Sequence, residues 1–272
     1  RGGLGKTALA RRFAQALLCE RPAADGAPCD TCAACGWFAQ GNHPDFRQVE
    51  PEILGAGQGA DEAPTSRTDN LSKQIKIDQV RELQTFLAVG SHRGGLRIVL
   101  VRPAEAMNAA TANALLKSLE EPGPRTLFML VSSQPQRLLP TLRSRCQAID
   151  VDVASRDAAL DWLRAQNVRD PDAELAFSGL APLQVLEAAE WAEQRARLVT
   201  ELARAPFDPL FAADRCAAIE ATQLVDVLQK WVYDLGRAAS ALPVRYFPGQ
   251  AAALRAISTT APPAPLLRFT RE

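Results

Sequence analysis

Apolar residues in the first 152 positions occur in two patterns that follow each other along the chain. Short apolar runs, typical of buried strands, alternate with stretches in which apolar residues recur at helical spacing. This alternation predicts a parallel α/β sheet with helices on both faces. The predicted strands are DFRQVEP (residues 45–51), RIVLV (97–101), TLFMLVSS (126–133) and QAIDV (147–151). The predicted helices are residues 7–19, 74–89, 109–119 and 138–143.

From Ser155 onward, helical spacing dominates and no strand pattern recurs. The predicted helical stretches are DAALDWLRAQ, LQVLEAAEWAEQRARLVTELARA and ATQLVDVLQKWVYDLGRAASAL. PFDP (residues 206–209) is a predicted joint between two helical pieces, because proline interrupts helices. Residues 54–70 lack periodicity and are predicted to form a mobile loop.

The net charge of the chain excludes few classes of function. The chain has 31 Lys and Arg against 31 Asp and Glu, so its balance gives no argument for a nucleic-acid surface. No apolar run approaches the length of a membrane span, and no signal peptide is visible. The chain starts at Arg1 inside a motif and ends on an amphipathic stretch, so we expect truncation at both ends.

The opening RGGLGKT carries most of a phosphate-binding loop, G-x-x-x-x-G-K-[ST], whose first glycine would precede Arg1. Gly2, Gly3 and Gly5 would allow a tight turn around phosphate, Lys6 would supply charge and Thr7 a hydroxyl for Mg²⁺. The alternative is a chance glycine-rich turn.

Hydrolysis also needs an acid after a neighbouring strand, to hold Mg²⁺. The strand RIVLV ends instead in Arg102-Pro103, and arginine has no acceptor atom. Glu105 lies three residues later and is expected to be a solvated carboxylate. The sequence therefore predicts a site that binds nucleotide, ATP or ADP with Mg²⁺, without turning it over.

Four of the six cysteines fall within 17 residues. Cys19, Cys29, Cys32 and Cys35 follow C-x9-C-x2-C-x2-C, a spacing that suits tetrahedral Zn²⁺ in a closed, structural site. The alternative is four buried thiols without metal. His43 is expected to bond its own turn, and Cys146 and Cys216 to be small core residues.

Two further segments carry a family resemblance. NALLKSLEEPGP (residues 113–124) and LFMLVSSQPQRLLPTLRSRCQAI (127–149), together with the cysteine cluster after the phosphate-loop helix, resemble the AAA+ subunits of bacterial DNA polymerase III clamp loaders, and specifically the delta-prime family. The likeness is dense over residues 1–150 and weak beyond them. Ser144-Arg145-Cys146 matches that family's S-R-C motif.

The resemblance implies a AAA+ domain with a zinc insert (residues 1–152, insert 19–35), a helical lid (153–205) and a helical collar cut at its C-terminal end (206–272). It implies that Arg145 enters the ATP site of a neighbouring subunit, where a guanidinium can stabilise phosphate charge. Ser133, or Ser132, occupies the position of a polar sensor of the γ-phosphate. Pro182 stands where the family's second sensor arginine would fall.

The resemblance further implies a cytoplasmic replication protein, without contact to a membrane. It would work in a hetero-oligomer with other AAA+ subunits and act, through that complex, on a sliding clamp and primer–template DNA. It would be part of a DNA polymerase holoenzyme without hydrolysing ATP itself. Two alternatives remain open: a free-standing P-loop ATPase in which Glu105 or Glu120 supplies the acid, and a zinc-stabilised binding module without nucleotide.

Overall fold

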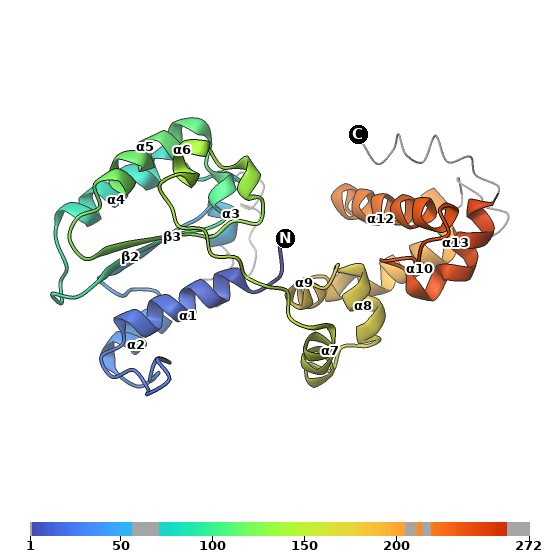
Figure 1. Ribbon diagram of the computed structural model, residues 1–272, viewed down its shortest axis with the longest axis horizontal. Helices are drawn as coiled ribbons and strands as arrows, with labels where there is room; N and C mark the ends of the chain where they lie inside the picture. The colour runs from blue at the N-terminus through green and yellow to red at the C-terminus, as the bar shows by residue number, and fades with distance from the viewer. Residues whose placement is uncertain (1, 56–70, 205–209, 211, 214–218, 260–272) are drawn as a thin grey trace. The chain divides into compact units, whose positions relative to one another are not determined.

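The computed structural model describes residues 2–55, 71–204, 210, 212–213 and 219–259 (Figure 1). It divides into two compact units. Residues 5–151 form the first unit, and residues from Asp152 onward, together with Gly2–Leu4, form the second. Most of the predicted loop at 54–70, the predicted joint at 206–209 and Cys216 lie outside the described residues.

The first unit is built on a three-stranded parallel sheet in the order β1-β2-β3. β1 (Phe46–Val49), β2 (Arg97–Val101) and β3 (Thr126–Leu130) confirm three of the predicted strands, each within a few residues of its expected bounds. Val49, Val101 and Leu130 pair at the carboxyl edge, so the residues that follow all three strands emerge at the same edge. β2 is buried along its whole length, as its uninterrupted apolar run requires.

The predicted strand at residues 147–151 is wrong. This segment lies among the described residues and forms no strand, and the side chain of Ile149 is 82% exposed. β3 pairs only with β2 among the described residues, so nothing supplies the ladder of hydrogen bonds that residues 147–151 would need. Apolar composition alone does not make a strand without a neighbour.

Helices cover both faces of the sheet, and Figure 1 shows them as separate layers. Ile98 and Leu100 pack on one face, whereas Val99 and Val101 pack on the other, as the two-residue period of a strand requires. On the first face lie α1 (Lys6–Leu18) and α2 (Ala33–Ala39). On the second lie α4 (Ile77–Ala88) and α5 (Ala109–Glu120). Shorter pieces are α3 (Glu52–Gly55), α6 (Pro140–Arg143) and 3₁₀ turns at Ala104–Ala106 and Pro135–Arg137.

Leu9, Phe13 and Leu17 share one face of α1 at the helical spacing that predicts this helix, but they are between 42% and 55% exposed. The side that meets the sheet carries the residues one position further on, Ala10, Ala14 and Leu18. The small side chains of the two alanines allow the helix to approach Ile98 and Leu100 closely.

The second unit is helical throughout its described part, as the spacing predicts. Its helices are α7 (Arg156–Ala165), α8 (Pro171–Phe177), α9 (Pro182–Glu187), α10 (Ala192–Leu202), α12 (Ala221–Ala239) and α13 (Ala251–Ser258), with 3₁₀ turns at Ala189–Trp191 and Pro248–Gln250. None of the described helices is both long and apolar enough to cross a bilayer. The stretch predicted as one helix from 183 to 205 breaks after Glu187, and Trp191 then packs edge-on against Phe177 at 6.0 Å.

A buried carboxylate fixes the loop between α12 and α13. Asp234 is fully buried in α12, and its oxygens accept hydrogen bonds from the backbone N–H groups of Arg245, Tyr246 and Phe247 at 2.8, 2.7 and 2.9 Å. Phe247 in turn packs against Trp231 in the core of this unit. One carboxylate therefore accepts hydrogen bonds from three backbone N–H groups that have no partner in a helix or strand.

Replacing Asp234 with alanine is expected to lower the free energy of unfolding by about 3 kcal/mol or more, because three donors lose a charged acceptor in the interior. Urea denaturation followed by tryptophan fluorescence measures this. Asp226→Ala is the control on the same helix. Its carboxylate is half exposed and makes one ion pair, with Lys230, so its loss should cost clearly less than the loss of Asp234. Equal costs for the two variants would contradict this role of Asp234.

Candidate metal centre, phosphate loop and Ser-Arg-Cys turn

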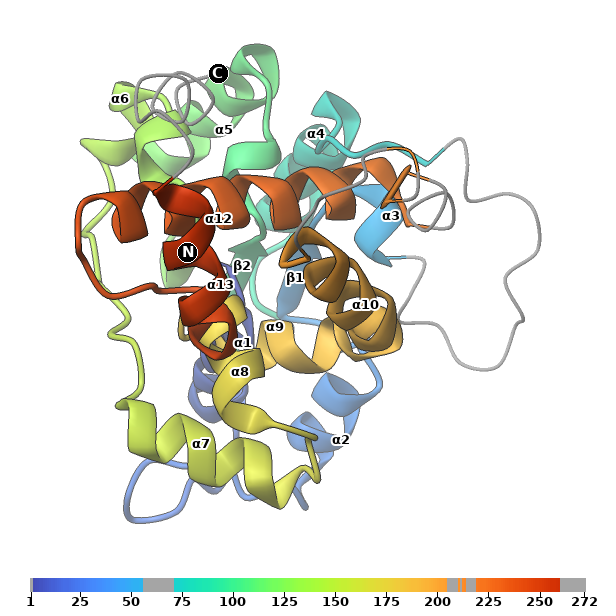
Figure 2. The same ribbon diagram turned by 90° about the vertical axis from the view of Figure 1, so that its right-hand side faces the viewer.

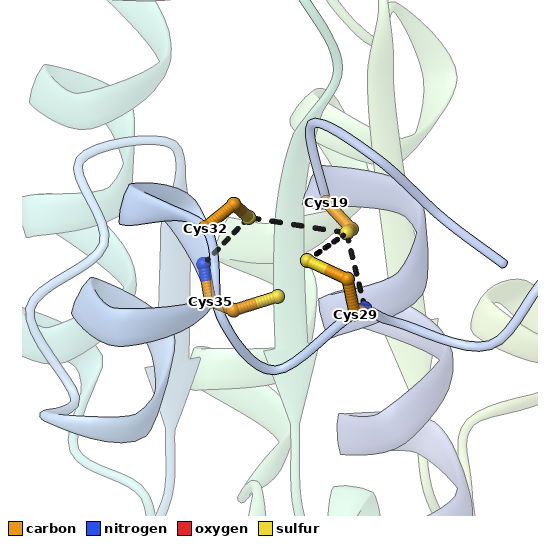
Figure 3. Close-up of side chains that lie close together, drawn as sticks. All are labelled: Cys19, Cys29, Cys32 and Cys35. Atoms are coloured by element: carbon orange, nitrogen blue, oxygen red, sulfur yellow. Dashed lines mark hydrogen bonds between the residues drawn. The ribbon is translucent and has the colours of Figure 1, made fainter.

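The four predicted ligands come together at the ends of two helices. Cys19 caps the C-terminal end of α1, and Cys32 caps the N-terminal end of α2, where its sulfur accepts the N–H of Cys35 at 3.4 Å. Cys29 lies on the loop between the helices and donates its backbone N–H to the Cys19 sulfur at 3.4 Å. Figure 3 shows the four thiols turned toward one another.

The sulfur spacing suits one tetrahedral ion. The Cys19 Sγ lies 3.5 Å from the Cys29 Sγ and 3.9 Å from the Cys32 Sγ, and all four sulfurs lie within 4.8 Å of one another. Zn–S bonds of about 2.3 Å in a tetrahedron place sulfurs about 3.8 Å apart. The cluster can therefore hold a metal ion with little movement.

The thiols differ in their ease of ionisation. Hydrogen bonds from the backbone and hydroxyl of Thr31 lower the pKa of Cys29 to about 6. Burial opposes ionisation of Cys32, but the N–H groups of Cys35 and Glu20 outweigh it, so the pKa of Cys32 is lowered. Burial, followed by the contacts with Cys32 and Cys19, raises the pKa of Cys35 to about 12. A bound cation would favour the thiolate at every position, because thiolates are the metal-binding form.

Polar contacts fasten the cysteine loop to α1. Arg12 donates two hydrogen bonds to the carboxylate of Asp30, at 2.7 and 2.9 Å, and Gln15 donates another at 2.8 Å. The Arg12 guanidinium holds the pKa of Asp30 below its usual range. His43 bonds its own turn as expected, accepting the Asp45 N–H at Nδ1 (3.1 Å), and burial lowers the pKa of His43.

The phosphate-loop residues begin α1. Gly5 is the N-cap residue in the left-handed region (φ 79°), a conformation that favours glycine, and its carbonyl accepts the N–H of Leu9 at 2.8 Å. Lys6 and Thr7 are the first residues of the helix, where N–H groups and the helix dipole favour an anion. Gly2 and Gly3 group with the second unit, in which the Gly3 carbonyl accepts the N–H of Leu183 at 3.3 Å.

At the carboxyl edge of the sheet, Arg102 pairs with an acid. Arg102 follows β2, Glu50 follows β1, and the two side chains form an ion pair with 15% and 14% of their surface exposed. The arginine thus occupies the place where a Mg²⁺-holding acid is expected, and it neutralises the acid next to it. This pair was not predicted from the sequence. The sequence carries a signal for the pair, because Arg102 directly follows one predicted strand and Glu50 lies near the end of another predicted parallel strand.

Glu105 is not the solvated carboxylate that the sequence predicts. Its Oε1 accepts the backbone N–H of Ser133 at 3.0 Å, and its Oε2 is buried. Ser133 lies in the segment that follows β3, so this contact ties the segment after β2 to the segment after β3. The Ser132 hydroxyl accepts the N–H of Gln134 at 3.1 Å, which makes it a turn residue.

Arg145 lies on the exposed turn that ends α6. Its Nη1 donates to the carbonyl of Thr141 at 3.0 Å, and its Nη2 lies 2.5 Å from Oε1 of Glu120. The Ser144 hydroxyl donates to the same Thr141 carbonyl at 3.0 Å. Cys146 is half-buried, and burial raises the pKa of its thiol. None of the contacts found for the Arg145 side chain involves a phosphate-loop residue.

Together these features define an α/β protein with a parallel sheet between helical layers, a cysteine-cluster insert and a buried Arg–Glu ion pair at the carboxyl edge of the sheet. Residues 1–155 match the family model described as DNA polymerase III, delta subunit. The chain belongs to this family, and the curated proteins it resembles include several delta-prime subunits.

The delta-prime subunit of Pseudomonas aeruginosa is 45% identical over 204 residues, which cover 72% of this chain and 56% of that protein. The Haemophilus influenzae protein is 32% identical over 225 residues, covering 78% and 63%. The Escherichia coli protein is 34% identical over 174 residues, covering 64% and 47%. The chain thus spans about half the length of the curated relatives it matches.

Proposed function

We propose that the chain is a delta-prime-type subunit of a clamp loader, which helps an ATP-driven complex place a sliding clamp on primed DNA. Its contribution to ATP hydrolysis is Arg145, supplied in trans to a neighbouring subunit. The observation that carries the proposal is the Ser-Arg-Cys turn, which holds a partly exposed guanidinium in a chain that belongs to this family. The partners are other clamp-loader subunits. Sequence likeness to a DNA polymerase III tau subunit, 30% over 155 residues, supports assembly from related subunits.

In this proposal the cysteine cluster is a structural zinc site. Cys19, Cys29, Cys32 and Cys35 would fill all four positions of a tetrahedral ion, leaving none open for a substrate. Bound zinc would supply cross-linking of the loop and no reaction chemistry. The sulfurs would hold α1 and α2 together beside the first face of the sheet.

In this proposal the chain's own nucleotide site keeps its phosphate-binding half, whereas Arg102 stands where an acid would hold Mg²⁺ and pairs with Glu50. Gly5, Lys6 and Thr7 stand at a helix N-terminus suited to phosphate, and Ser133 of the same unit would add a nucleotide contact. The acids that the rival proposal of a free-standing ATPase requires are already engaged. Glu105 accepts the Ser133 N–H and Glu120 pairs with Arg145.

The purified protein alone, incubated with Mg-ATP, is therefore expected to show no turnover above background. Arg102 cannot bind Mg²⁺ in place of an acid, because it has no acceptor atom. Phosphate release measured by a coupled assay tests this, with Lys6→Ala as the control. Clear turnover that Lys6→Ala abolishes would favour the free-standing ATPase instead.

A further inference from the structure

The ion pair between Arg145 and Glu120 joins two separate elements of the first unit. Glu120 is the last residue of α5, and Arg145 follows the C-terminal end of α6. Figures 1 and 2 show the two helices side by side. The side chains are 36% and 48% exposed, so solvent, or another molecule, can reach them.

Both partners stand on anchored backbone. The side chain of Asn108 caps α5 by accepting the Thr111 N–H at 2.9 Å, and Leu115 of the same helix is fully buried. In α6, Leu142 is 1% exposed, and its carbonyl accepts the backbone N–H of Arg145 at 3.2 Å. Because both helices are anchored by buried residues, the ion pair holds the guanidinium in a fixed place on the first unit.

The location of Glu120 is unfavourable for an acid by itself. The carbonyl groups at the C-terminal end of a helix carry partial negative charge, which repels a carboxylate. Arg145 offsets this charge. Glu121, the next residue, forms no ion pair in the described part of the chain, so it provides a matched acid at the same helix end.

We propose that Glu120 is a positioning residue for Arg145, and this inference rests on the proposed function. The Glu120 carboxylate pairs with Nη2 of the guanidinium, and the Thr141 carbonyl and Ser144 hydroxyl accept from its Nη1. A guanidinium has five donors, so the others stay available to the phosphate oxygens of a neighbouring subunit's nucleotide. Holding the side chain in one orientation before the neighbour binds lowers the entropy lost on contact.

The test uses the reconstituted clamp loader with Glu120→Ala, Glu120→Gln and the control Glu121→Ala. We expect Glu120→Ala to lower kcat for ATP about three- to fivefold, the upper part of the range for an exposed pair, and to leave KM unchanged. Glu120→Gln keeps an acceptor oxygen and should recover part of the loss. Glu121→Ala should match the wild type. Gel filtration checks that each variant assembles.

A double-variant cycle separates positioning from a structural effect. In an Arg145→Ala background, Glu120→Ala should cause no further loss, because the group it positions is gone. Full wild-type turnover of Glu120→Ala, higher turnover, or an undiminished loss in that background would each overturn the inference. If Arg145→Ala itself leaves turnover unchanged, the proposed function fails. If only Glu120→Ala is without effect, the proposed function stands and the positioning role fails.

Discussion

Replacing Arg145 with alanine should lower ATP turnover at the neighbouring site of the reconstituted clamp loader by about a thousandfold, the lower end for an arginine that stabilises phosphoryl charge. The total ATP turnover of the complex should fall by a smaller factor, because its other ATP sites keep working. A steady-state assay with DNA and clamp present measures the total, and single-turnover hydrolysis isolates the affected site. Assembly should be unchanged, because the side chain is partly exposed and its ion pair with Glu120 contributes at most about 1 kcal/mol.

Arg143→Ala is the control for this result. Arg143 is an exposed arginine two residues earlier, within α6, and its removal changes the net charge by the same amount. If both variants lowered turnover equally, a general loss of positive charge would explain the effect. If neither did, Arg145 would have no role in the neighbouring site.

Removing the metal is expected to unfold the cysteine insert and to lower stability by several kcal/mol, because thiolate–zinc bonds replace a core that this polar loop lacks. Elemental analysis should find about one zinc per chain. Cys32→Ser should reduce it well below one, since it removes a proposed thiolate ligand while serine can still cap α2. A strong chelator should lower the thermal midpoint of the wild type.

Cys146→Ser provides the matched control, because Cys146 is a half-buried thiol outside the cluster. We expect it to keep its zinc and to lose less than about 1 kcal/mol. If elemental analysis found no zinc in the wild type, and the chelator left its thermal midpoint unchanged, the metal site would be ruled out. The four cysteines would then be thiols without metal.

The sequence predicts those elements whose signal is local. The apolar run of β2, the helical spacing of α5 and the cysteine spacing each depend on residues close together in the chain, and each is present in the structure. Residues 147–151 have the composition of a strand but no neighbouring strand to bond. Their misassignment shows that a strand depends on its partner as much as on its own residues.

The features of the site that the sequence did not predict are ion pairs between residues far apart in the chain. Glu50 and Arg102 meet because β1 and β2 are parallel neighbours, and Glu120 meets Arg145 because α5 and α6 pack together. Composition cannot assign such partners. Treating Glu120 and Glu105 as free acids for Mg²⁺ therefore overlooked the groups that already occupy them.

The Arg102–Glu50 pair and the Ser-Arg-Cys turn both favour the proposed role, in which the chain acts at a neighbouring subunit's ATP site and not at its own. Arg102 and Glu50 neutralise each other at the edge where a working ATPase needs a free acid. Arg145, in contrast, keeps an exposed edge although Glu120 and Thr141 hold it. Both features support the proposal that this chain assists hydrolysis at a neighbouring site and does not hydrolyse ATP itself.

The most direct test of the proposed role in trans is a structure of the assembled clamp loader with a non-hydrolysable ATP analogue. It would measure the distance from the Arg145 guanidinium to the nearest phosphate oxygen of the neighbouring subunit's nucleotide. We predict a hydrogen bond of about 3 Å. An Arg145 that stays more than about 6 Å from every phosphate oxygen, beyond hydrogen-bonding reach, would contradict the account.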